Sequence, residues 1–196
     1  DVVKAYGADT MRLYIMFIGD FEKVATWSDD AVKGCKRFLD RVWNLAEQAT
    51  EEKGISEKNA PIVHKTIKKV TDDIDTLKMN TAIAALMAMV NELYANGLSH
   101  GDLEALLLML SPFAPHMVEE LWEQKGFAAE HEGKMAMQCD WPVYDESKTV
   151  ASSVEMAVQV SGKLKGTITV PVDSDQDTVV EAAKASEKVA KALAGM

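Results

Sequence analysis

The sequence predicts a mainly α-helical protein, an antiparallel helical bundle followed by a small α/β piece that starts with a β-hairpin. Three observations support this fold class. Up to about residue 125, apolar residues recur every three or four positions in segments joined by short polar loops, which is typical of bundled helices. A leucine-rich run ends at two closely spaced prolines. From Ser153 onward, apolar and polar residues alternate with a period of two, which is typical of strands.

The composition is that of an ordinary globular protein. The chain has 196 residues, 47% of them hydrophobic and 27% charged, which is enough for one large or two small domains. No apolar run approaches the roughly 20 residues that span a membrane, and no signal peptide is visible. Cys35 and Cys139 are far apart, so we expect no structural disulfide and a cytoplasmic location. The chain begins at Asp1 without an initiator Met, so we expect a piece of a longer protein.

The first elements are two short helices and a long one. We expect a helical turn over residues 1–6, ended by Gly7, and a helix over residues 10–17 capped by Asp9. A polar connector follows over residues 20–26. Ser28 should cap a long helix that runs from residue 29 to about residue 53 and ends at Gly54. Its apolar stripe consists of Cys35, Phe38, Leu39, Val42, Leu45, Ala46 and Ala49.

Three cations occupy another face of this long helix. Lys33, Arg37 and Arg41 recur at i, i+4 and i+8, so they lie one helical turn apart. A solvated helix face explains this pattern. A contact with an RNA backbone also explains it, because cations at this spacing can follow successive phosphates.

Two further helices and the leucine-rich run complete the bundle. A helix over residues 62–77 should pack along a narrow seam of Val63, Ile67, Val70, Ile74 and Leu77. Asn80 or Thr81 should cap the next helix. The buried face of that helix is expected to consist of Ile83, Leu86, Met87, Val90, Leu93 and Tyr94.

Pro112 and Pro115 re-aim the chain after the leucine-rich run. Proline lacks an N–H and clashes with the preceding turn, so the leucine-rich helix should stop near Ser111. Pro115 is tolerated as the first residue of a new helix. Met117, Val118, Leu121 and Trp122 then fall on its apolar face.

The C-terminal part is expected to contain a hairpin and a helix. Ser161 and Gly162 form a two-residue turn, after which Leu164, Ile168 and Val170 should share one face. Lys163 and Lys165 lie on the opposite face. Residues 173–177 supply turn and cap residues. A helical pattern follows, with apolar residues at Val179, Val180, Ala183, Val189 and Leu193.

Several strings in this chain resemble the leucyl-tRNA synthetases, a family of class Ia aminoacyl-tRNA synthetases. The strings are YGADTMRLY at 6–14, RFLDRVWNL at 37–45, NTAIAAL at 80–86, SPFAPHMVEELW at 111–122, DWPVYD at 140–145 and VQVSGKLKGTI at 158–168. The last string separates this family from the valine, isoleucine and methionine enzymes, which do not carry it. The chain departs from the family pattern in two places. Asp20 and Phe21 stand where proline is common, and Lys165 stands where arginine is usual.

The resemblance implies a domain order and a partner. Residues 1–27 would be connector helices that follow a catalytic domain, residues 28–143 the helical bundle of the class Ia anticodon-binding type, and residues 144–196 a truncated C-terminal α/β domain. The implied partner is leucine tRNA, with no DNA and no membrane, bound by a monomer. The tRNA-binding residues would be Lys33, Arg37, Arg41, Lys163 and Lys165.

The sequence contains no catalytic motif. It lacks a Walker loop, a Rossmann fingerprint, a zinc-finger spacing and the ATP-binding signatures of class I synthetases. His116 and Glu120 share a helix face, but two ligands without a third make a poor metal site. We therefore expect no catalytic residue, metal or cofactor here, whereas the parent enzyme would use ATP and magnesium. Two alternatives remain open: the same region of a valine, isoleucine or methionine enzyme, and a free-standing helical module that binds a protein.

The net charge argues against a general nucleic-acid binder. It is −10 for the whole chain, with 21 Lys and Arg against 31 Asp and Glu. Any RNA contact must therefore come from local groups of cations and not from the overall field.

The lack of nucleotide-binding motifs leads to a first prediction. The pure chain should show no leucine-dependent exchange of pyrophosphate into ATP, because it has no residues that bind and activate ATP. A complete leucyl-tRNA synthetase assayed in parallel is the positive control. Exchange above the level without leucine would contradict the prediction.

Overall fold

The structure divides into two compact units, residues 1–149 and residues 150–196, which are described separately. It is a computed structural model that describes residues 2–19, 24, 26–150, 153–160, 162–172, 174–186 and 188–190. The expected features at Asp20 and Phe21, Ser161, Asp173 and Leu193 lie outside the described residues.

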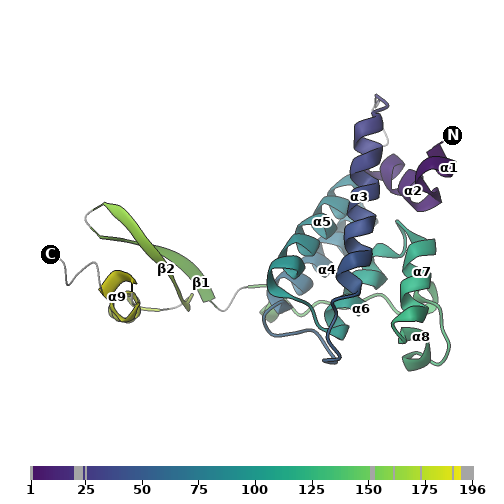
Figure 1. Ribbon diagram of the computed structural model, residues 1–196. Helices are drawn as coiled ribbons and strands as arrows, with labels where there is room; N and C mark the ends of the chain where they lie inside the picture. The colour runs from purple at the N-terminus through teal and green to yellow at the C-terminus, as the bar shows by residue number, and fades with distance from the viewer. Residues whose placement is uncertain are drawn as a thin grey trace. The chain divides into compact units, whose positions relative to one another are not determined.

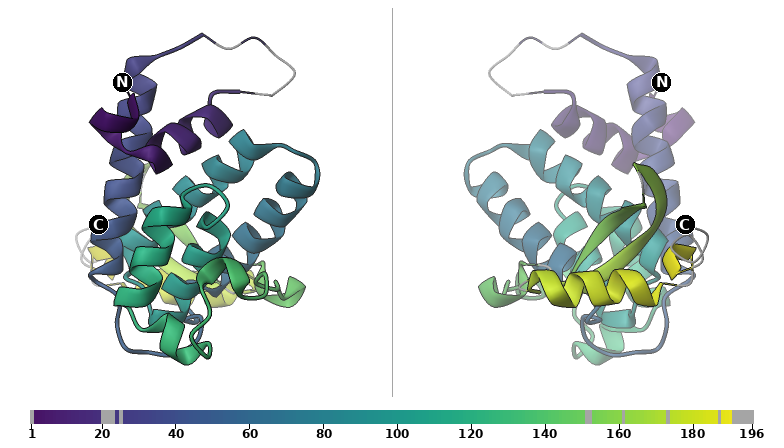
Figure 2. Two further views of the ribbon diagram at one scale, coloured as in Figure 1. Left: turned by 90° about the vertical axis from the view of Figure 1, so that its right-hand side faces the viewer. Right: turned by 90° about the vertical axis from the view of Figure 1, so that its left-hand side faces the viewer.

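The regular elements that the structure describes in the first unit are helices. They are α1 (Val2–Tyr6), α2 (Ala8–Phe17), α3 (Asp29–Ala46), α4 (Ala60–Asp75), α5 (Met79–Asn96), α6 (His100–Leu110), α7 (Pro115–Gln124) and α8 (Phe127–Glu130), followed by 3₁₀ helices at Ala136–Gln138 and Glu146–Lys148. Helix α4 packs against α5, and α6 packs against α7 (Figure 1). Figure 2 shows α2 lying against both α3 and α5. The predicted helical bundle is confirmed.

Helix α6 lies at the centre of the bundle. Its residues from Gly101 to Leu110 are buried, except for Glu104. A helix that is apolar around its whole circumference must be covered on all sides, which the surrounding helices achieve. The expected core residues are buried, since Phe38, Val70, Leu86, Leu107 and Leu121 are each 4% exposed or less.

The buried start of α6 carries a carboxylate that holds a neighbouring loop. Asp102 is 0% exposed and accepts hydrogen bonds from Ser56 N (3.1 Å), Ser56 Oγ (2.7 Å), Asn59 Nδ2 (2.8 Å) and Ser99 N (3.0 Å). Ser99 Oγ in turn accepts from Asp102 N, so the two residues form a capping box. A buried charge is tolerated only when it is hydrogen-bonded in this way.

The same loop explains why α3 is shorter than predicted. The helix was expected to reach about residue 53, but it ends at Ala46. After it, Thr50 N donates to Leu98 O and His100 N donates to Glu52 O, so this backbone pairs with the start of α6 instead of continuing a helix. Gly54 does not end α3 as predicted. It lies against Gly101, where an added Cβ would come within 2.2 Å of the Gly54 backbone.

Other corrections concern helix ends. Ser28 caps α3 as predicted, accepting from Ala31 N at 3.3 Å. Leu77 was placed on the packing seam of α4, but that helix ends at Asp75, and Leu77 is 66% exposed in a left-handed turn with φ of 58°. Asn80 and Thr81 lie inside α5, where neither caps the helix, because α5 begins at Met79.

The proline break has the predicted form. Helix α6 ends at Leu110, and α7 begins at Pro115. Phe113 and Ala114, between the two helices, are fully buried, so the bend itself belongs to the core. Val118, Leu121 and Trp122 are buried on the predicted apolar face of α7, whereas Met117 is half-buried.

The segment after residue 139 packs along α4. The indole N–H of Trp141 donates to Thr71 Oγ1 at 2.8 Å, and Asp145 N donates to His64 Nδ1 at 3.1 Å. Burial, together with the nearby Lys148, lowers the pKa of His64 against the opposing effect of Asp145. Lys68 binds both carboxylate oxygens of Glu146 at 2.8 Å.

The second unit is a hairpin with a helix. Strand β1 (Ser153–Val160) pairs antiparallel with β2 (Lys163–Pro171), and α9 (Gln176–Ala185) is capped by Asp175. Ile168 and Val170, which were expected to share one face with Leu164, are both buried. Leu164 does not share their environment, since it is 64% exposed. The reason is a register shift, in which Gln159 pairs with Leu164 but Val158 pairs with Gly166.

A second prediction tests the bundle core. Leu86→Ala should lower the free energy of unfolding by about 2–5 kcal/mol, because it leaves a cavity beside a fully buried helix face. Urea unfolding followed by tryptophan fluorescence reports on the first unit alone, since all four tryptophans, Trp27, Trp43, Trp122 and Trp141, lie within it.

The exposed Leu77 supplies the matched control. Leu77→Ala removes the same atoms from a surface turn and should change stability by less than about 0.5 kcal/mol. Equal losses in the two variants would contradict the assigned core.

Candidate functional site

The predicted basic stripe lies on the exposed side of α3. Lys33, Arg37 and Arg41 are all exposed, while Val32, Phe38 and Val42 of the same helix face the core. Their spacing of four residues corresponds to about 6 Å along the helix axis. The structure therefore brings these three predicted residues together in one row.

The three cations differ in their surroundings. Lys33 Nζ lies 3.3 Å from the carboxylate of Asp30, so an acid competes with any phosphate for its N–H donors. Arg37 has no carboxylate partner within the described part of the chain. Asp40, three residues after Arg37, is instead paired with Lys36. The stripe thus offers an arginine whose donors are not already used by an acid.

Arg41 is held from the neighbouring helix. Its guanidinium carbon lies 4.9 Å from the centre of the Tyr94 ring, and Tyr94 Oη donates to the backbone oxygen of Arg41 at 2.7 Å. Tyr94 was expected on the buried face of α5, but it is 36% exposed. The ring lies at the surface because its contacts are with Arg41, an exposed residue of α3.

Lys163 and Lys165 lie in the second unit. Both are exposed, and Lys163 pairs with Val160 at the closed end of the hairpin. Lys165 is the extra residue at the register shift, since its two neighbours, Leu164 and Gly166, take the two partners on β1. A bulge of this kind twists the strand and redirects a side chain. These two lysines are described within their own unit and are not placed relative to the stripe on α3.

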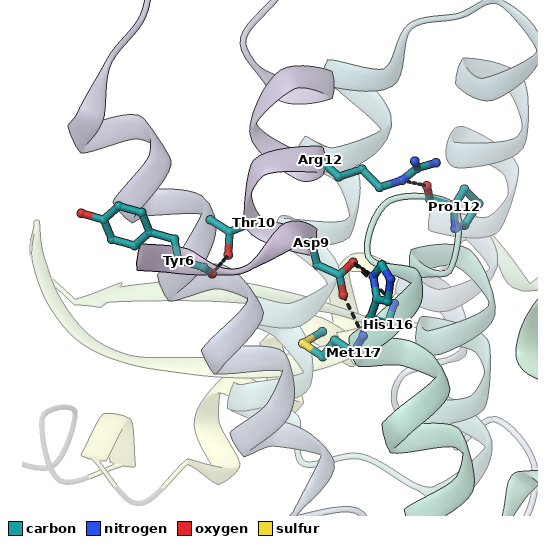
Figure 3. Close-up of polar contacts among 7 residues, drawn as sticks. All are labelled: Tyr6, Asp9, Thr10, Arg12, Pro112, His116 and Met117. Atoms are coloured by element: carbon teal, nitrogen blue, oxygen red, sulfur yellow. Dashed lines mark hydrogen bonds and ion pairs between the residues drawn. The ribbon is translucent and has the colours of Figure 1, made fainter. Parts of the chain in front are cut away.

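A second polar site joins α2 to the start of α7 (Figure 3). The Asp9 carboxylate accepts from Met117 N at 2.7 Å and from His116 N at 3.4 Å, and it lies 2.8 Å from His116 Nδ1. Asp9 was predicted to cap its own helix. It instead caps α7, which lies more than 100 residues away in the sequence, because α2 packs with its first turn against the helix that follows the proline break.

This junction has further contacts and borders a cavity. Arg12 Nε donates to Pro112 O at 2.9 Å, so α2 also holds the proline bend (Figure 3). A cavity of about 330 Å³ lies beside the Asp9 carboxylate and is lined by residues of α1, α2, α3 and α7, among them Trp43 and Lys36. The string SPFAPHM is therefore a joint between the first helices and the bundle.

The remaining histidines, cysteines and acids were compared with the arrangements that hold metal ions. Across the described ranges, no group of three or more His, Cys, Asp or Glu side chains could hold a metal ion. His116 is bound to Asp9, and His131 lies 2.7 Å from Glu104. Both cysteines are free, and burial raises the pKa of Cys35 to about 11, so this thiol is unreactive at neutral pH. In the described part of the chain, no helix has the length and apolar character needed to cross a membrane.

Most of the chain matches a known protein family. Residues 62–181 match the family described as the anticodon-binding domain of tRNA ligases. The chain belongs to this family. The matched region begins within α4 and includes the helices around the proline break and most of the second unit.

The relatives of this anticodon-binding domain are leucine–tRNA ligases. The chain is 46% identical over 196 residues to the leucine–tRNA ligase of Alkaliphilus oremlandii (strain OhILAs), which covers 100% of this chain and 24% of that protein. It is 43% identical over 201 residues to the enzyme of Chlorobaculum tepidum, covering 99% of the chain and 24% of that protein. The chain thus spans about a quarter of the length of these relatives, and they favour the leucine enzymes over the other class Ia synthetases.

A solved structure gives the same answer. The chain superimposes with a TM-score of 0.68 and 29% identity on a leucyl-tRNA synthetase, AgnB2 of Agrobacterium radiobacter K84, in a ternary complex with tRNA and LeuAMS. The match covers 98% of this chain and 27% of that one. The fold predicted for this anticodon-binding domain is therefore that of the leucyl-tRNA synthetases.

Two residues of these sites were missed from the sequence. Asp9 was assigned a local cap, and the sequence holds no signal for its partner, which only the folded packing of α2 on α7 supplies. Tyr94 was assigned to the core because it follows Val90 by four residues. A polar hydroxyl at the edge of an apolar stripe is the signal that it could lie at the boundary with solvent.

The joint yields the third prediction. Asp9→Ala should lower the free energy of unfolding by about 1–3 kcal/mol, because it leaves the first N–H groups of α7 without an acceptor. Asp9→Asn keeps one acceptor oxygen and should lose less. Urea unfolding followed by tryptophan fluorescence measures both.

Asp72→Ala is the matched control, since this aspartate lies exposed on α4. Its stability should stay within about 0.5 kcal/mol of the parent chain. If Asp9→Ala is as harmless as Asp72→Ala, the carboxylate does not hold α7.

Proposed function

We propose that this anticodon-binding domain holds leucine tRNA for a leucyl-tRNA synthetase, the enzyme that joins leucine to its tRNA with ATP. The observation that carries the proposal is the 46% identity to a leucine–tRNA ligase along the whole chain. The solved relative in complex with tRNA supports tRNA as the partner. The bundle would position the tRNA body, so that the acceptor end reaches an active site in another part of the enzyme.

The contact with RNA is assigned to the five cations predicted from the sequence. Within the bundle, Arg37 and Arg41 are the strongest candidates, since Lys33 is paired with Asp30. Arginine can donate two parallel hydrogen bonds to one phosphate, which lysine cannot do. On the hairpin, Lys163 and Lys165 supply charge without that geometry, so we expect their contacts to be weaker.

The proposed role also implies where the cofactors bind and where the chain acts. ATP and magnesium would be bound by the parent enzyme, and this chain would contribute no ligand to either. The chain would act as a monomer in the cytoplasm, with neither DNA nor a membrane as a partner. The two free thiols are compatible with a reducing compartment.

The fourth prediction tests the arginine row. Arg37→Ala combined with Arg41→Ala should weaken binding of a leucine tRNA transcript at least about tenfold, since the two arginines place charge-assisted bonds on phosphates. The slope of log Kd against log salt should also fall by about the number of phosphate contacts removed. Fluorescence anisotropy with labelled tRNA, from low to physiological salt, measures both quantities.

Lys65→Ala combined with Lys78→Ala is the matched control. Both lysines are exposed, and the pair removes the same two positive charges from other parts of the bundle. If the two double variants lose affinity equally, the overall charge and not the arginine row governs binding. If the parent chain does not bind the tRNA at all, the alternative of a protein-binding module gains support.

In the complete enzyme, the same double variant should separate binding from chemistry. Aminoacylation should slow, while leucine-dependent pyrophosphate exchange should remain at the parent level. Unchanged aminoacylation at physiological salt would make the row an ordinary solvated helix face.

A further inference from the structure

Tyr94 of α5 makes two separate contacts with Arg41 of α3. The ring of Tyr94 lies under the guanidinium, and its hydroxyl is bonded to the backbone of the same arginine. One side chain of α5 therefore fixes both the side chain and the main chain of a single residue on α3. Tyr94 stays at the surface while doing so, with 36% of its area exposed.

We propose that Tyr94 is a positioning residue for tRNA binding, which holds the guanidinium of Arg41 ready for a phosphate. The inference rests on the proposed function, because it concerns the same arginine row. It adds a residue that carries no charge and that lies on a different helix from the row.

The geometry leaves the donors of Arg41 available. The attraction of a guanidinium to a ring needs no ring acceptor atom, and the guanidinium of Arg41 lies 4.9 Å from the centre of the Tyr94 ring. A carboxylate partner would instead use the N–H groups of the guanidinium. The residues three and four positions from Arg41 are Arg37, Phe38, Asn44 and Leu45, none of which is an acid. The tyrosine thus contacts the arginine at a position where no neighbouring acid on α3 competes for its N–H groups.

Restraint before binding should raise affinity. A free arginine side chain loses rotamer freedom when it binds a phosphate, and part of this loss is avoided if a neighbour already holds it. The other cations of α3 show the contrast. Lys33 and Lys36 are paired with carboxylates, which occupy N–H donors that a phosphate would need. Arg41 is the member of the row that is both held and free to donate.

A contact between a lysine and a tyrosine ring in the same unit provides the comparison. Lys68 Nζ lies 5.5 Å from the centre of the Tyr144 ring, but it is bound at 2.8 Å by both oxygens of Glu146. That lysine is already engaged, so its ring contact should have no effect on tRNA.

The experiment measures binding of the leucine tRNA transcript by the 196-residue chain at physiological salt. Tyr94→Ala should weaken binding by about two- to fivefold, the range expected for one cation–ring contact. Tyr94→Phe keeps the ring and should recover most of the affinity. Tyr144→Ala should bind like the parent. Urea unfolding by tryptophan fluorescence, run on each variant, reports whether the bundle remains folded under binding conditions.

A double-mutant cycle decides whether Tyr94 acts through Arg41. In an Arg41→Ala background, Tyr94→Ala should cause no further loss of affinity, because the group that it positions is gone. In an Arg41→Lys background the effect should also shrink, since an ammonium lacks the planar group that stacks. A purely structural tyrosine would instead weaken binding equally in all three backgrounds, which would overturn the inference.

The remaining outcomes separate this inference from the proposed function. If Arg41→Ala weakens binding and Tyr94→Ala does not, the positioning role is wrong and the arginine row stands. If Arg41→Ala itself leaves affinity unchanged, the assignment of the row to tRNA is wrong, and the role of Tyr94 is overturned with it.

Discussion

The bundle depends on burying α6, an apolar helix whose ends are polar. Covering a helix on all sides removes its terminal N–H and C=O groups from water, and each must then find a partner in the protein. At the start of α6, Ser99 and Asp102 supply these partners and also bind the loop that follows α3. At its end, the carbonyl of Leu108 accepts from Ser111 Oγ, and the carbonyl of Leu110 accepts from the backbone N–H groups of Phe113 and Ala114. Phe113 also fills the core. The first helices then hold the bend, through Arg12 on the carbonyl of Pro112.

Much of the fold could be predicted from local patterns. The proline break, the cap at Ser28 and the buried face of α3 all depend on residues within a few positions of one another, so sequence spacing determines them. The helix ends and caps that were predicted wrongly are those determined by contacts with segments distant in the sequence. Helix α3 stops at Ala46 because the next residues pair with the start of α6. Asp9 caps α7, although its position in the sequence predicts a cap for α2. Leu77 leaves the seam because the turn into α5 places it in a left-handed conformation.

The part of the candidate site that depends on residues close together in the sequence could also be predicted. Helical spacing alone predicts that Lys33, Arg37 and Arg41 form a row, and the structure has them in one. Spacing does not show which of the three is compensated by an acid, since that depends on side-chain geometry at Asp30 and Asp40. It also cannot show that Tyr94, which shares the stripe of core residues on α5, reaches Arg41. On the hairpin, the register shift beside Lys165 changes the face on which Leu164 lies. The isolated Gly166 within β2 is the residue signal for such a bulge, and strict alternation overlooked it.

The acidic total of this anticodon-binding domain is compatible with the proposed role. Many of its carboxylates are used internally: Asp102 and Asp9 bind backbone N–H groups, and Asp40, Asp73 and Glu146 pair with lysines. Charges more than about 8 Å apart are strongly screened at physiological salt, so a phosphate beside Arg37 would sense mainly its immediate neighbours. A net charge of −10 would then weaken non-specific attraction to polyanions without weakening a placed contact. On this argument affinity depends on the geometry of a few arginines, and a residue that fixes that geometry, as we propose for Tyr94, matters more than an additional lysine.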